Sequence, residues 1–183
     1  RLLPRPLPAT MLKTRVITAL LLVVGLGLIL FALPPLAAVL TFAAIAALAA
    51  WEWGGLMKQD QPARAMYAFV LLLFCWQLTV AAPQLIPVLL AVSVAFWILV
   101  VPLWFRFKWT LAGNDFFGYL LGALVILPTW AAMVALHAVD TWLMLAAMAL
   151  VWVADISAYF AGRAFGKHGK HKLAPTISPG KTW

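Results

Sequence analysis

A carboxylate lies inside an apolar stretch near the end of this chain. Asp155 stands in the run LVWVADISAYF, where a charged side chain is costly unless it meets water, a cation or a partner. Tyr159 follows four residues later and Gly162 seven residues later, so the three residues share one face of a helix. Such an acid is a candidate for metal binding or for organising a cation site. Two structural alternatives stay open: Asp155 reaches the membrane interface, or it pairs with Arg163.

Basic and hydroxyl side chains follow this acid. From Arg163 to Trp183 the chain carries five Lys or Arg residues, two histidines and three glycines. Ammonium and guanidinium groups, together with exposed backbone N–H groups, suit a phosphate-bearing ligand. The polar order Thr176, Ser178, Pro179, Gly180, Lys181, Thr182 indicates something more specific than a solubilising loop. A basic loop that only touches lipid head groups has a similar composition, so charge alone leaves both interpretations open.

Other site types fit this stretch poorly. Gly180-Lys181-Thr182 ends like a Walker A motif, but Pro175 occupies the place of the first glycine and no buried strand precedes it. His168 and His171 have no third ligand nearby, which argues against zinc. Gly162 and Gly166 form a small-xxx-small pair, but the adjacent Arg163 weakens a dimerisation motif.

The composition indicates that lipid is the solvent around these residues. Of 183 residues, 66% are hydrophobic and 10% are charged, whereas about a quarter are charged in an ordinary soluble domain. The net charge is +8, but the basic residues are separated by long apolar runs, which argues against a nucleic-acid partner. The single cysteine, Cys75, excludes a disulfide framework within the chain.

Six apolar segments approach the roughly 20 residues that a spanning helix needs. They are about Val16–Leu33, Leu36–Met57, Ala65–Ala82, Leu85–Phe105, Phe117–Leu136 and Thr141–Phe160. Basic residues precede the first segment and follow the second, fourth and sixth, and the other breaks contain none. The positive-inside rule places these basic segments and the amino terminus in the cytoplasm. We therefore predict an all-α fold, a polytopic membrane helix bundle with about six spans.

Three regions follow from this division. Residues 1–10 are expected to be a disordered or non-native extension, because Met11 opens MLKTRVITALLLVV like a natural start. Residues 11–162 are the helical scaffold, and residues 163–183 are a basic cytoplasmic loop. Asp115 and Asp140 are expected to cap the fifth and sixth spans. Glu52 is either an interfacial acid or a second acid in the cavity of Asp155.

The end of the chain resembles the phosphatidate cytidylyltransferase, or CDP-diacylglycerol synthase, family. The resemblance rests on Asp155-Ile-Ser-Ala-Tyr159-Phe-Ala-Gly162-Arg163, Phe165-Gly166-Lys167, His171-Lys172-Leu173-Ala-Pro175 and Ile177-Ser178-Pro179-Gly180-Lys181-Thr182-Trp183. The start from Met11 to Ala19 and the Trp51-Glu52 pair are also similar to bacterial members. Gly180 replaces a lysine that the family often carries, which removes one potential phosphate contact.

This resemblance implies a Mg²⁺-dependent reaction of CTP with phosphatidic acid that gives CDP-diacylglycerol and pyrophosphate in a bacterial inner membrane. It implies catalytic roles for Asp155 and Lys181, with Asp155 as a metal ligand. It also implies substrate contacts from Tyr159, Arg163, Lys167, Lys172, Ser178 and Thr182. Membrane lipids are the expected surroundings, and a homodimer is an open alternative to a single copy.

The same resemblance implies that the main metal-binding carboxylates belong to a motif beyond Trp183, so residues 1–183 alone are expected to be inactive. Two further classes stay open. One is a CTP-dependent lipid-alcohol kinase, which would release CDP rather than pyrophosphate. The other is a transporter or scaffold protein whose basic loop binds anionic lipid.

Overall fold

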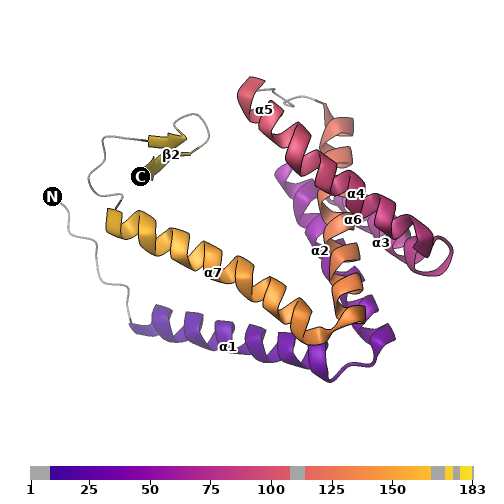
Figure 1. The fold of residues 1–183 in the computed structure, drawn as a ribbon, viewed down its shortest axis with the longest axis horizontal. Coiled ribbons are helices and arrows are strands. Elements are labelled where there is room, and N and C mark those ends of the chain that lie inside the picture. The colour runs from indigo at the N-terminus through magenta and orange to yellow at the C-terminus, as the bar shows by residue number, and fades with distance from the viewer. Residues whose placement is uncertain (1–8, 108–113, 166–171, 175–177, 183) are drawn as a thin grey trace. The chain divides into compact units, whose positions relative to one another are not determined.

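The computed structural model describes residues 9–107, 114–165, 172–174 and 178–182. The elements are α1 (Ala9–Phe31), α2 (Pro35–Leu56), α3 (Gln61–Val80), the 3₁₀ turn η1 (Pro83–Leu85), α4 (Ile86–Ala95), the π-helical turn η2 (Phe96–Val100), α5 (Val101–Phe107), α6 (Asp115–Val139), α7 (Thr141–Phe165), β1 (Lys172–Ala174) and β2 (Ser178–Thr182) (Figure 1). The predicted all-α membrane fold is confirmed. The chain forms two compact units, Arg1–Ala138 and Val139–Trp183.

Helices long and apolar enough to cross a membrane account for the second to sixth predicted spans. Among the described residues they are Pro35–Leu56, Gln61–Val80, Pro83–Phe107, Asp115–Val139 and Thr141–Gly162. The first predicted span is helical too, but its described apolar part, Ile17–Phe31, is shorter. At 1.5 Å per residue it covers about 22 Å of a roughly 30 Å hydrocarbon core. The protein is therefore an integral membrane protein.

Prolines and polar caps set the helix boundaries. Pro34 has no N–H and cannot donate to the carbonyl of Leu30, where α1 is ending. The Nε2 atom of His137 lies 3.2 Å from that carbonyl oxygen, and because a carbonyl only accepts, the ring nitrogen donates. Leu30 O thus obtains a partner from α6, 107 residues away in the sequence.

Two of the predicted caps have different outcomes. Asp140 caps α7, as predicted, because its Oδ1 accepts from the backbone N–H of Trp142 at 3.1 Å. Asp115 is not the cap of α6: Asn114 takes that role, and its Oδ1 accepts from Phe117 N at 3.3 Å. Asp115 is the first helical residue, where its negative charge interacts favourably with the positive end of the helix dipole.

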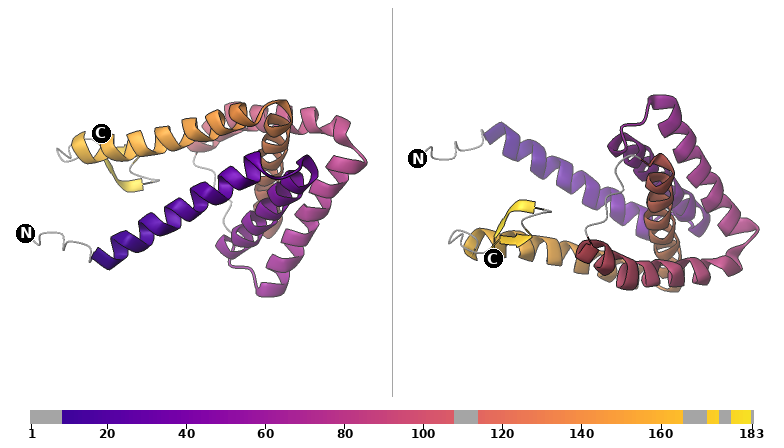
Figure 2. Two further views of the ribbon diagram at one scale, coloured as in Figure 1. Left: turned by 90° about the horizontal axis from the view of Figure 1, so that it is seen from below. Right: turned by 90° about the horizontal axis from the view of Figure 1, so that it is seen from above.

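The core of the first unit is built on a four-residue spacing. The buried positions of α2 include Ala38, Phe42, Ala46, Ala50 and Gly54, those of α3 are Tyr67, Leu71 and Cys75, and those of α6 include Gly122, Ile126 and Trp130. Residues four apart form the ridges that pack helices together, and small residues let two backbones approach. α2 and α3 lie side by side in both views of Figure 2.

The predicted basic loop contains secondary structure. β1 pairs with β2 in an antiparallel sheet, with Lys172 opposite Thr182 and Ala174 opposite Ser178. The register is irregular between these two pairs, and the part of β2 between them includes Pro179, which has no N–H to give to the ladder. These residues of the predicted basic loop therefore form a short hairpin, which the sequence did not indicate, because strand pairing depends on register rather than on apolar periodicity.

Candidate functional site

The acid-bearing face of α7 is exposed over its described length. Asp155 is exposed, and Tyr159 has an exposed fraction of 63%. The Tyr159 ring packs edge-on against Phe160, with centroids 5.5 Å apart. A Cβ atom added at Gly162 would meet nothing within 4 Å. The predicted common face of these residues therefore exists as a stretch of continuous helix with open space at Gly162.

Asp155 stands further from the end of its helix than the predicted span suggests. α7 continues to Phe165, ten residues beyond the acid, which is about 15 Å at 1.5 Å per residue. Asp155 lies within Thr141–Gly162, which among the described residues is the part of α7 long and apolar enough to cross a membrane. A charge at that depth needs water, a cation or a partner.

The hairpin brings together two residues that were predicted separately as phosphate contacts. Lys172 and Thr182 are direct cross-strand partners, although ten positions separate them in the sequence. Ser178 and Lys181 lie on the same strand as Thr182. Partners in an antiparallel pair have Cα atoms about 4.5–5.5 Å apart, so one small anionic group can reach both positions. For these residues and for Arg163 the structure describes the backbone alone, and Lys167 lies outside the described residues.

The described residues supply one carboxylate to a metal at this site. No group of three or more His, Cys, Asp or Glu residues gathers anywhere in the described parts of the chain. The other described acid of this unit, Asp140, precedes Asp155 by 15 residues, or about 22 Å along a helix. One carboxylate suits Mg²⁺, which commonly uses one or two carboxylates with phosphate oxygens and water. The chemistry fits, but the described residues do not complete a site.

A cationic corner in the first unit was not predicted. The Nε of Arg64 donates to the backbone oxygen of Trp51 at 3.0 Å, and its guanidinium carbon lies 4.8 Å from the centroid of the Trp51 ring. Its Nη2 is 3.7 Å from Oε1 of Glu52. The Arg64 side chain is 17% exposed and that of Glu52 is 77% exposed. Glu52 is therefore an exposed acid with a basic neighbour, and neither interpretation of it is tested.

The sequence did carry a signal for this corner. Cβ atoms added at Gly54 and Gly55 would lie 3.0 Å from the Arg64 side chain. Paired glycines at the end of a span mark a close approach, and here the approaching group is a guanidinium. Its bonds close the turn between α2 and α3, so we assign it a structural role.

A second missed feature holds α6 against α2 and α3. Trp53 Nε1 donates to Gly118 O at 3.0 Å, and Tyr67 Oη donates to Tyr119 O at 2.9 Å. Both polar groups pass over Gly122, where an added Cβ would lie 2.5 Å from the Tyr67 oxygen and 2.6 Å from the Trp53 nitrogen. Gly118 and Gly122 are spaced as small-xxx-small, which is the signal that could have found this contact.

The comparisons with known proteins cover both compact units. The model of the cytidylyltransferase family matches residues 13–183. A phosphatidate cytidylyltransferase of Pseudomonas aeruginosa is 38% identical over 182 residues, which cover 94% of this chain and 64% of that protein. A phosphatidate cytidylyltransferase of Haemophilus influenzae is 31% identical over 197 residues, covering 94% of this chain and 67% of that protein. No solved structure matches.

This chain thus spans about two thirds of the length of these two relatives. The family match includes both compact units and all of the candidate residues. The chain belongs to the cytidylyltransferase family.

Proposed function

We propose that the protein is a phosphatidate cytidylyltransferase, in which the second unit binds the phosphates of CTP and phosphatidic acid. A phosphate oxygen of phosphatidic acid attacks the α-phosphorus of CTP, and the bond from this phosphorus to the β-phosphate oxygen breaks. The products are CDP-diacylglycerol and pyrophosphate. The observation that carries the proposal is the pairing of Lys172 with Thr182 in a hairpin that follows a membrane span bearing Asp155.

The basic residues of the hairpin suit the negative charge of the phosphates that react. Lys181 and Lys172 neutralise negative charge that builds up on the transferring phosphates, and Ser178 and Thr182 add hydrogen bonds. Arg163 and Lys167 extend this basic segment toward the end of α7. We assign Tyr159 to the lipid substrate, because it lies exposed on the Asp155 face within a membrane span and an aromatic ring with a hydroxyl suits the boundary between lipid and water.

Asp155 is proposed to hold a Mg²⁺ ion together with substrate oxygens. When bound, this ion would offset charge on the triphosphate. Its binding can be followed without turnover by titrating the chain with Mn²⁺ and recording the electron paramagnetic resonance of the free ion. We expect Asp155→Asn to weaken Mn²⁺ binding about tenfold or more, since one charged oxygen ligand is lost. Asp140→Asn is the matched control, because asparagine also caps a helix.

Location follows from the chemistry. CTP is a cytosolic polyanion, and the basic segments fall on one side of the predicted spans, so we propose that the hairpin faces the cytoplasm of a bacterium and that the spans lie in its inner membrane.

The decisive experiment measures hydrogen exchange of the chain in lipid nanodiscs with CTP and Mg²⁺. We expect CTP to slow exchange of the amides of β1 and β2, and expect Lys172→Ala to remove this protection. An anionic-lipid scaffold would show equal exchange with and without CTP, which would refute the proposal. Wherever turnover is measured, pyrophosphate release identifies cytidylyl transfer, whereas CDP release would identify a lipid-alcohol kinase.

A further inference from the structure

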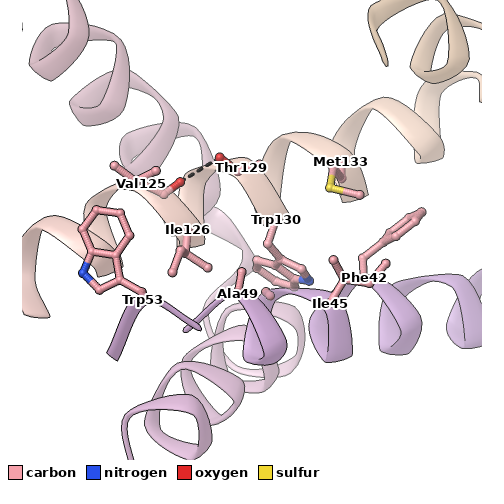
Figure 3. A pocket seen from close by; sticks show the side chains of 10 residues that line it. Phe42, Ile45, Ala49, Trp53, Val125, Ile126, Thr129, Trp130 and Met133 are labelled. Atoms are coloured by element: carbon pink, nitrogen blue, oxygen red, sulfur yellow. Dashed lines mark hydrogen bonds between the residues drawn. The ribbon is translucent and has the colours of Figure 1, made fainter. Parts of the chain in front are cut away.

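An apolar groove opens between α2 and α6, within the first unit. Its volume is about 310 Å³, within the range of roughly 300–1,000 Å³ that is typical of ligand sites. Phe42, Ile45, Ala46, Ala49 and Trp53 line it from α2, and Val125, Ile126, Thr129, Trp130 and Met133 line it from α6 (Figure 3). No lining residue is charged, and both helices are membrane spans.

The groove has the dimensions of a single hydrocarbon chain. Its lining extends from Phe42 to Trp53 of α2 and from Val125 to Met133 of α6, which corresponds to about 12–16 Å along each helix. Dividing the volume by this length gives a mean cross-section of about 19–26 Å². This corresponds to a width of about 5 Å, close to the 3.5–4.0 Å contact separation of carbon atoms. A helix is about 10–12 Å wide and could not enter.

One polar group in the groove wall lacks a partner. Trp130 is 1% exposed, and its indole Nε1 is the buried side-chain nitrogen for which no hydrogen-bond partner exists among the described residues. Figure 3 shows this nitrogen on the edge of the ring that faces the Ile45 side of the groove. The Thr129 hydroxyl, by contrast, donates to Val125 O at 2.7 Å.

A buried N–H without an acceptor costs roughly the desolvation of the group. Trp χ2 is a broad torsion, so a rotation of the ring would be the way in which this buried N–H meets an acceptor in the groove. The carbonyls of a neighbouring helix already bond within that helix, whereas the ester carbonyl of a lipid is a free acceptor on an apolar chain.

We propose that this groove binds one acyl chain of a bilayer glycerolipid, whose ester carbonyl accepts a hydrogen bond from Trp130. The site makes no charged contact and therefore does not select a head group, which separates it from the substrate phosphates. The inference does not rest on the proposed activity, because it uses only the first unit.

The test is photolabelling of the chain in nanodiscs with a phosphatidylcholine that carries a diazirine in its acyl chain, followed by peptide mapping. Label is expected on the peptides that contain residues 42–53 and 125–133. Ala49→Leu fills the groove at an exposed position. It should lower this labelling about tenfold, as if about two methylene groups lost apolar contact. Ala44→Leu is the matched control on the same helix, exposed but outside the lining, and should leave labelling unchanged.

A second arm tests the hydrogen bond. Trp130→Phe keeps an aromatic ring and removes the N–H, so ester-linked lipid should lose about fivefold in labelling while an ether-linked probe stays the same. The proposal would be overturned if the two Ala variants were labelled equally, or if the label mapped outside the groove. It would also be overturned if Trp130→Phe left the preference between ester and ether probes unchanged. A cross-link of the groove to another protein, found in place of the lipid label, would also overturn the proposal.

Discussion

The hydrogen bonds within each of the two compact units join residues at different separations in the sequence. In residues 1–138, side chains of α2, α3 and α6 donate to backbone oxygens that are 52, 65 and 107 residues away in the sequence. In residues 139–183, the described contacts include the cap of α7, a neighbouring aromatic pair and a short hairpin. The first unit thus carries the tertiary bonds, and the second carries the residues suited to phosphate chemistry.

This difference has a physical reason. Hydrogen bonds between spanning helices fix helix positions and need tight approach, which glycines and alanines provide. Residues that bind a polyanion must stay accessible to it, so they cannot be covered by the same kind of packing. Substitutions in the first unit should therefore change stability, and substitutions at the candidate site should change binding.

The largest loss of stability is expected from Gly122→Ala. The added Cβ would lie 2.5 Å from Tyr67 Oη and 2.6 Å from Trp53 Nε1, so both hydrogen bonds to α6 must break or shift. We expect the free energy of unfolding in detergent micelles to fall by about 3 kcal/mol, combining overpacking with two interhelical hydrogen bonds.

Gly27→Ala is the control, because a Cβ at Gly27 meets nothing within 4 Å. It should leave stability equal or raise it by about 0.5–1 kcal/mol, as glycine is a poor helix former. Equal losses for the two variants would show that Gly122 does not mark a close contact.

Arg64→Met is expected to cost less, about 2 kcal/mol. The substitution keeps an apolar stem but removes the bond to Trp51 O and the guanidinium over the Trp51 ring, each of which contributes about 1 kcal/mol. Thermal unfolding of both proteins in the same detergent measures the difference. Glu52→Gln should change stability by no more than about 0.5 kcal/mol, because the ion pair is long and Glu52 is exposed. A larger effect of Glu52 than of Arg64 would mean that the ion pair dominates this corner.

Tyr67→Phe should have a smaller effect, about 1 kcal/mol. Only the hydroxyl that donates to Tyr119 O is lost, while the Tyr67 ring stays 4.8 Å from that of Tyr119. A double-mutant cycle with Trp53→Phe separates the two bonds: they should add within about 0.5 kcal/mol if they act independently. Strong coupling would indicate that α6 moves as a whole when one bond is removed.

Asp155→Asn should have the smallest effect on stability, within about 0.5 kcal/mol, because the side chain is exposed and has few native contacts. Binding of Mn²⁺ should nevertheless weaken as stated above. A loss of stability comparable to that of Gly122→Ala would show that Asp155 is a structural residue and would remove the contrast between the two units.

The amount that sequence reasoning could predict differs between spans, caps and contacts. The length of the apolar runs predicted the spans, because a segment that crosses lipid must satisfy its own backbone hydrogen bonds, as a helix does. The cap of α7 was predicted correctly and that of α6 was displaced by one residue, since Asn114 and Asp115 are both good caps. The β1–β2 pairing was missed, because Lys172–Ala174 and Ser178–Thr182 are too short and polar to show strand periodicity.

By itself, the sequence determined what depends on local composition: membrane helices from apolar length and helix ends from prolines. It also predicted a phosphate-binding segment from Lys, Ser and Thr beside glycine. The tertiary structure alone decided which partners meet. Nothing in the sequence shows that Leu30 O, left without a donor by Pro34, bonds to His137, or that Trp130 keeps a buried N–H beside an open groove. These pairings arise when helices far apart in sequence pack together, and only the geometry of that packing selects the atoms that meet.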